Sequence, residues 1–313
     1  MNLWTRNFNA EKLISLYNNS FSLYSQLCVD FGSLKFTIFE KVKLHKSLIP
    51  LNQTFGRSVK MEQFFYRVPN DWIRSKPPDI KKICTCYLID ETRGLGGRGI
   101  TSIQYITDNC GYKQRRGFSQ INSVYETILQ NLFDSDLISL INGYQFPPQN
   151  ISTAIPYMVN ENKFDVVDNF TKLSDREFDA IIRNNPNRNK ENLLALYLYV
   201  KSFYHQSTTG NRPIGFYQNL DTVKERIGLS RYTAIGLYNE LIEKKLLYKY
   251  YVGSREISKS GGTVRENVPN IYIPNLGQDV EELEDTYKST VDIMKDFYGV
   301  AEFLPFMKSL KEI

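Results

Sequence analysis

The strongest constraint on the fold is that the chain carries one pattern of residues twice. Residues 65–72 resemble residues 170–177, because each is a short extended segment that runs into a capping residue and then a helix. An apolar helix follows at a similar distance in both copies, at 80–89 and at 192–200. A repeated pattern predicts that one supersecondary unit is built twice.

Both copies then continue in the same order. A glycine-rich loop leads into a short strand, a short helix ends at a glycine, and a longer helix follows. The matching stretches are 94–99 and 210–215 for the loop, 100–103 and 216–218 for the strand, Gly111 and Gly228 for the end of the short helix, and 124–129 and 237–242 within the longer helix. The first copy has a few extra residues around 112–116.

The second copy gives the clearer signals for a helix-turn-helix. Asp221 is expected to cap a helix over 222–227, and Gly228 to end it in the left-handed conformation. Ser230 then caps the next helix after a tight turn. The three-four spacing of apolar residues predicts that one face of this helix is buried, through Ala234, Leu237, Tyr238 and Leu241.

A β-hairpin is predicted after this helix. Residues 246–252 and 268–273 read as its two strands, and the glycine-rich, basic stretch 253–262 reads as a flexible tip. Helix, strand, helix, turn, helix and hairpin is the winged-helix order. We therefore expect an α+β, mainly helical fold with two winged-helix domains in tandem and helical extensions at both ends.

This fold class predicts a division of the chain into five parts, and we expect each winged helix to have its own core. The parts are an N-terminal extension at 1–60, a first winged helix at 61–146, a linker at 147–165, a second winged helix at 166–276 and an acidic helical tail at 277–313. Pro147, Pro148 and Pro156 are expected to limit the flexibility of the linker.

Three segments also resemble known proteins. Residues 228–234, followed by 241–247, resemble the winged-helix segments of bacterial replication initiators and transcription regulators. Residues 62–69 look like the entry to the amino-terminal winged helix of plasmid initiators from low-GC Gram-positive bacteria. This resemblance implies binding of double-stranded DNA. The first copy departs from the pattern, since residues 134–136 (Asp-Ser-Asp) stand where a basic entry to the wing is expected.

Charge is unevenly distributed along the chain. Residues 279–313 hold nine acidic and four basic side chains, so this tail carries −5 and the rest of the chain +10 within a net charge of +5. A basic body favours a polyanionic partner.

In the second copy, the outward face of the recognition helix is expected to meet the major groove of DNA. That face comprises Arg231, Tyr232, Thr233, Ile235, Gly236 and Asn239. Arg231 suits guanine or phosphate, and Asn239 suits adenine. Gly236 either lets the backbone approach DNA closely or relieves crowding in the core. On the wing, Arg255, Lys259 and Arg265 are candidates for contacts with phosphates or the minor groove.

The first copy yields a second set of candidates by alignment of the repeats. Its recognition helix is expected to bury Ile121, Val124, Tyr125 and Ile128, and to expose Ser119, Gln120, Asn122 and Ser123. Just ahead of it lie the polar and basic residues Lys113, Gln114, Arg115 and Arg116, which we expect along the phosphates.

The sequence favours no catalytic, metal or cofactor site. Residues 94–99 are glycine-rich but lack the lysine and hydroxyl residue of a phosphate-binding P-loop. Cys84 and Cys86 are expected to pack in the core, and the few cysteines and histidines have no zinc-finger spacing. Since no signal peptide or membrane span is evident, we expect a cytoplasmic, nucleoid-associated protein that does not bind membranes.

Within DNA binding, the sequence is compatible with two functions. One is initiation of replication at the origin of a plasmid, phage or other mobile element, and the other is repression or activation of transcription. A third alternative, from another class, is a protein-interaction adaptor, since winged helices also serve that role. Further partners to consider are replication or transcription proteins and a second copy of the chain.

Overall fold

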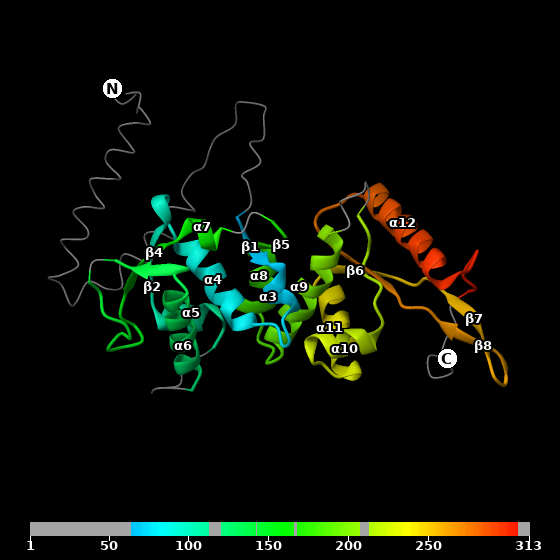
Figure 1. Cartoon of the computed structure of the whole chain (residues 1–313), viewed down its shortest axis with the longest axis horizontal. Coiled ribbons are helices and arrows are strands. Elements are labelled where there is room, and N and C mark those ends of the chain that lie inside the picture. The colour runs from blue at the N-terminus through cyan, green and yellow to red at the C-terminus, as the bar shows by residue number, and fades with distance from the viewer. Residues whose placement is uncertain (1–63, 113–119, 142, 166–167, 207–212, 306–313) are drawn as a thin grey trace, which may run out of the picture. The chain divides into compact units, whose positions relative to one another are not determined.

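The computed structural model describes residues 64–112, 120–141, 143–165, 168–206 and 213–305 (Figure 1). Helices dominate, and the strands form small antiparallel sheets, as expected of a mainly helical α+β chain. All of these described residues belong to one compact unit. The expected N-terminal extension, 1–60, lies outside the described residues.

The first repeat has a strand and short helix at its entry, followed by three helices and a three-stranded sheet in the order β2-β4-β3. Its elements are β1 (Phe65–Pro69), α3 (Asn70–Arg74), α4 (Ile80–Thr92), the 3-10 turn η1 (Leu95–Gly97), β2 (Arg98–Thr101), α5 (Ile103–Asn109), α6 (Gln120–Asp134), β3 (Ile138–Leu140), β4 (Ile155–Val159) and α7 (Glu161–Phe164).

The second repeat follows the same order. Its elements are β5 (Phe170–Ser174), α8 (Asp175–Phe178), the π-helical turn η2 (Asp179–Arg183), α9 (Lys190–Gln206), α10 (Leu220–Ile227), α11 (Arg231–Glu243), β6 (Leu247–Tyr250), β7 (Ser254–Lys259), β8 (Gly262–Asn267), β9 (Ile271–Pro274) and the added helix α12 (Val280–Tyr298). Where the first repeat has β2, the second has a single bridge between Phe216 and Tyr272.

The segment expected as a spacer, 147–165, instead completes the first sheet. Residues 155–159 form β4, which pairs with both β2 and β3. Ile155, Tyr157 and Val159 alternate into the core, while Pro156 and Met158 face away from it. Pro156 had suggested a linker, but a strand accepts proline where the ladder does not need its missing N–H.

An antiparallel ladder joins the two repeats. In the pairing of β1 with β5, Arg67 lies opposite Lys172, which occupies the equivalent position of the other repeat. Antiparallel pairing of equivalent strands about equivalent residues relates them by a local two-fold axis. The side chains follow the same symmetry. The Arg67 guanidinium lies 5.1 Å from the ring centroid of Phe170, and the Lys172 ammonium lies 4.5 Å from that of Phe65.

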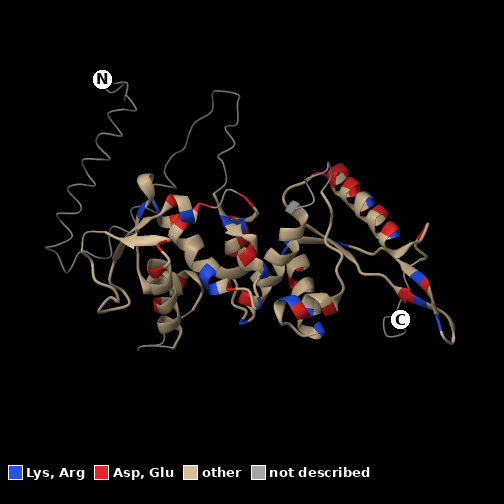
Figure 2. Ribbon diagram, viewed as in Figure 1, with Lys and Arg blue, Asp and Glu red and all other residues tan. Residues whose placement is uncertain are grey.

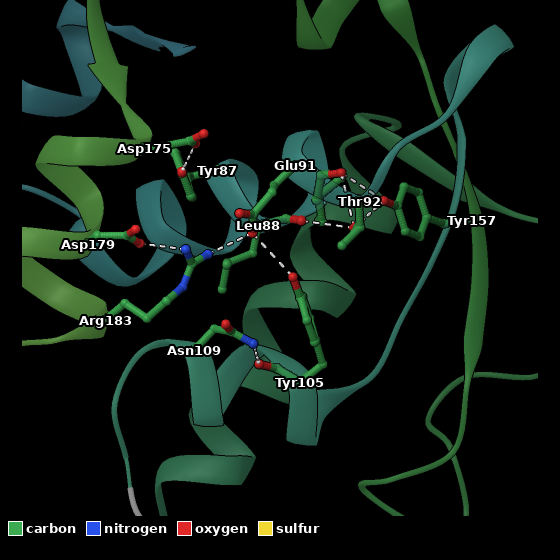
Figure 3. A network of polar contacts seen from close by, with 11 residues as sticks. Tyr87, Leu88, Glu91, Thr92, Tyr105, Asn109, Tyr157, Asp175, Asp179 and Arg183 are labelled. Carbon is green, nitrogen blue, oxygen red and sulfur yellow. Dashed lines mark hydrogen bonds and ion pairs between the residues drawn. The ribbon is translucent and has the colours of Figure 1, made fainter. Parts of the chain in front are cut away.

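Polar and aromatic contacts reinforce this junction (Figure 3). Tyr87 of α4 stacks on Phe178 of α8 with ring centroids 3.9 Å apart, and its hydroxyl donates to Asp175 at 2.5 Å. Arg183 donates to Glu91 at 2.7 Å, and Tyr105 donates to the same Glu91 oxygen at 3.2 Å. One continuous hydrophobic cluster runs through both repeats. Apolar side chains of the two repeats therefore pack against one another.

The acidic tail begins with the expected helix, α12. Leu283 and Met294 of this helix join a second apolar cluster with Ile271 and Ile273 of β9. The backbone N–H of Gly215 donates to the Thr290 hydroxyl at 2.8 Å, which ties α12 to the segment before α10. Beyond α12 the chain returns to the base of the β7–β8 hairpin, where Leu304 and Ser254 exchange two backbone hydrogen bonds of 2.8 Å.

Candidate nucleic-acid interface

The helix pair α10–α11 has the expected turn between its helices. Gly228 ends α10 with φ of 79°, and the Ser230 hydroxyl accepts a hydrogen bond from the Thr233 N–H at 3.1 Å, so both of these predictions are confirmed. The cap of α10 was predicted wrongly. Asn219 accepts from the Thr222 N–H at 2.8 Å, while Asp221 lies within the first turn of the helix.

One face of α11 is buried as predicted, by Ala234, Leu237, Tyr238 and Leu241. On the opposite face, Tyr232 is 89% exposed and Ile235 is 47% exposed. Arg231, Gly236 and Asn239 are exposed as well. Thr233 differs from the expectation, because it is half-buried and its hydroxyl is hydrogen-bonded to Ser230 at 2.8 Å.

Two residues on this face have informative surroundings. The Arg231 guanidinium lies 3.6 Å from the Asp221 carboxylate, and both side chains are well exposed. An exposed pair of this kind is weak, so Arg231 can exchange Asp221 for another anion. Outside its own helix, no heavy atom of the described residues lies within 4 Å of the position that a Gly236 Cβ would take. Gly236 therefore does not relieve crowding in the core, and that alternative is wrong.

In the first repeat, α6 turns a partly different face inward from the one expected. Tyr125 and Ile128 are buried as predicted, but Asn122 is also buried and Val124 is 37% exposed. The buried residues Tyr125, Ile128, Leu129 and Leu132 of α6 have the same spacing as Ala234, Leu237, Tyr238 and Leu241 of α11. The repeats thus match one helical turn away from the expected alignment. A one-turn shift keeps most residues on the same face but misplaces those at its edge.

The outward face of α6 contains Gln120, Ser123 and Thr127, all exposed. The first two were predicted there, whereas Thr127 emerges only with the corrected alignment. The remaining candidates of the first repeat, Lys113, Gln114, Arg115, Arg116 and Ser119, lie outside the described residues.

The expected flexible wing tip is a regular hairpin, in which β7 pairs with β8 from Ser254–Asn267 to Lys259–Gly262. Lys259 is exposed beside the turn. Arg255 forms an ion pair with Glu266 at 2.7 Å and lies 4.2 Å from the ring centroid of Tyr298. Arg265 donates to the Ser254 hydroxyl at 2.6 Å and to the Pro305 carbonyl. The two arginines therefore have structural partners within the chain.

Charge is mixed around these elements (Figure 2). Basic and acidic side chains alternate on α10, which packs beside α11 and exposes Lys224, Glu225 and Arg226. Acidic residues follow the outer face of α12. The exposed cations near α11 are therefore accompanied by acidic side chains, since α10 carries Asp221 and Glu225 beside Lys224 and Arg226.

The cysteines and the glycine-rich loop, which the sequence did not favour as catalytic, metal or nucleotide sites, pack within the fold. Cys84, Cys86 and Cys110 are buried free thiols, and burial raises the pKa of the Cys86 thiol to about 12. In the glycine-rich loop, a Cβ on Gly99 would meet the Tyr157 hydroxyl at 2.2 Å, so close packing requires that glycine. No cluster of metal-ligating side chains occurs among the described residues. No helix in the described ranges has the length and apolar character needed to span a membrane.

Comparison with known proteins finds no family model and no curated protein that matches this sequence.

Proposed function

We propose that this chain binds double-stranded DNA through two winged helices, with α11 and α6 as recognition helices. The observation that carries the proposal is α11 itself. It follows α10 after a tight capped turn, buries one face completely, and exposes Arg231, Tyr232, Ile235, Gly236 and Asn239 on the other. Strands β6 and β9 follow it, as the wing follows the recognition helix in this motif.

The biological role that we propose is initiation of replication at an origin of a plasmid, phage or other mobile element. Its support is the resemblance of residues 62–69 to plasmid initiators and of residues 228–234 and 241–247 to replication initiators and transcription regulators, together with the repeat of one pattern within the chain. Regulation of transcription is the second candidate, since a single winged helix serves either role. Repeated binding sites at an origin favour initiation, whereas one site at a promoter favours regulation.

The test measures binding of the purified chain to duplex DNA from its own locus by fluorescence anisotropy. We expect affinity to fall by orders of magnitude between about 50 and 200 mM salt, because phosphate contacts release counterions. Arg231→Ala should reduce affinity by roughly 1–3 kcal/mol and relax the preference at one base pair. Absence of binding at the lower salt concentration would overturn the proposal.

A further inference from the structure

The exposed face of α11 is unusual for a surface that meets a polyanion, because it is mostly uncharged. The helix contains one basic residue, Arg231, which lies at its first position. The residues that follow on the exposed face are Tyr232, Ile235, Gly236 and Asn239. Their spacing places them along one strip of the helix, opposite the buried residues.

This strip leaves large apolar side chains in solvent. Tyr232 is the more exposed of the two, at 89%, and Ile235 is 47% exposed one turn later. Isolated exposed apolar residues are ordinary. Here, however, both lie next to Gly236, Tyr232 one turn before it and Ile235 directly before it, and the missing side chain of Gly236 leaves open space beside them. The surface is therefore suited to a partner with small apolar groups at its edge.

The major groove of DNA offers one such group, the C5 methyl of thymine, while adenine presents an acceptor and a donor that asparagine can pair. We propose that the strip formed by Tyr232, Ile235 and Gly236 reads thymine methyl groups and that Asn239 reads an adjacent adenine. The target of α11 is then an A·T-rich half-site. This inference rests on the proposed function and specifies its substrate.

Charge on the neighbouring elements favours DNA over a protein as the occupant. Arg231 stands at the start of the strip beside Asp221, and α10 exposes Lys224 and Arg226 together with Glu225, so the cations exceed the carboxylates by one. These cations suit the phosphates that border a major groove. The strip itself is one row of residues on one helix, whereas sites that dock proteins are usually broad apolar patches.

The experiment replaces thymine by deoxyuridine, which removes only the methyl group, at each position of a mapped binding site. For the unmodified chain we expect a loss of about fourfold in affinity for each contacted methyl. Ile235→Ala should show a similar loss on thymine DNA and no further loss on the deoxyuridine duplex at the position it contacts. Tyr232→Ala is the second variant. It should behave in the same way at the thymine that Tyr232 contacts.

Leu95→Ala is the matched control, because Leu95 is an apolar side chain 94% exposed on a different loop. It should bind both duplexes as the unmodified chain does. DNA binding that is equal on thymine and deoxyuridine duplexes overturns the inference but leaves the proposed function standing. The same conclusion follows if Ile235→Ala weakens binding equally on both. Failure to bind any duplex at low salt overturns the proposed function itself.

Discussion

At the residue scale, Gly236 is an exposed glycine in the interior of a helix, where the proposed function and stability make opposite demands. A glycine inside a helix costs about 1 kcal/mol relative to alanine. Its neighbours in the structure give no steric reason for it, since the space beyond its Cα is open. Among the described residues nothing compensates for this conformational cost, and close approach of a DNA base edge is the explanation that fits the proposed function.

Gly236→Ala should consequently have opposite effects on folding and binding. We expect the free energy of unfolding to rise by about 1 kcal/mol, because alanine is the better helix former. DNA affinity should fall, because the added methyl group occupies the opening in the strip. Thermal unfolding and anisotropy measure the two effects. Gly228→Ala is the control, since its φ of 79° strains an alanine and should lower stability instead. Unchanged DNA affinity in Gly236→Ala would contradict close approach.

At the element scale, the β7–β8 hairpin is held by Leu304 and Pro305, which follow α12. Ser254 pairs with Leu304, and Arg265 reaches the carbonyl of Pro305. A Cβ on Gly253 would lie 2.2 Å from the Leu304 carbonyl oxygen, so the strand entry and the tail are in close contact. The segment that follows α12 thus braces the base of the hairpin and leaves its tip exposed.

This arrangement separates the roles of the basic residues on the hairpin. Lys259→Ala should weaken binding to all DNA sequences about equally and reduce the slope of log affinity against log salt by about 0.9, the effect of one lost phosphate contact. Arg265→Ala should instead loosen the hairpin, which limited proteolysis detects as faster cleavage at residues 253–267. If Lys259→Ala leaves the salt slope unchanged, its side chain does not contact a phosphate.

Many of the helix boundaries could be predicted from the sequence, because the residues that begin and end a helix give local signals. Gly228 and Ser230 define the turn before α11 through capping chemistry that acts within a few residues. The β1–β5 pairing has no such signal, since it joins residues about a hundred positions apart in the chain. The one-turn error in α6 has a similar origin: aligned apolar residues agree in several helical registers, and only packing chooses between them.

At the scale of the whole molecule, the shared core changes what the tandem arrangement implies. A flexible linker would let each repeat find its own half-site. Here the β1–β5 ladder, the Tyr87–Phe178 stack and the Arg183–Glu91 ion pair couple the repeats directly. The joined repeats therefore pack as one unit, and if α6 and α11 both bind DNA as proposed, they do so from that one unit.

We therefore predict a strict requirement for the spacing between half-sites. Inserting five base pairs turns one half-site to the opposite face of the duplex, and inserting ten restores the face but separates the sites by about 34 Å more. Both insertions should lower affinity to that of a single half-site, because the joined repeats cannot separate. Gel-shift titration of the three duplexes measures this. Recovery of affinity with the ten-base-pair insertion would indicate that the two repeats separate. Equal affinity for all three duplexes would mean that one repeat alone binds DNA.

The pairing of β1 with β5 also sets an order of events during synthesis. Strand β1 (Phe65–Pro69) leaves the ribosome long before its partner β5 (Phe170–Ser174) has been translated. At the usual elongation rates of about 5–20 residues per second, the first strand waits roughly 5–20 seconds with its edge unpaired. Over that interval the nascent first repeat exposes the apolar side of Tyr87, whose stacking partner Phe178 is also still to come. Newly made chains should be most prone to aggregation, or to capture by chaperones, within that interval.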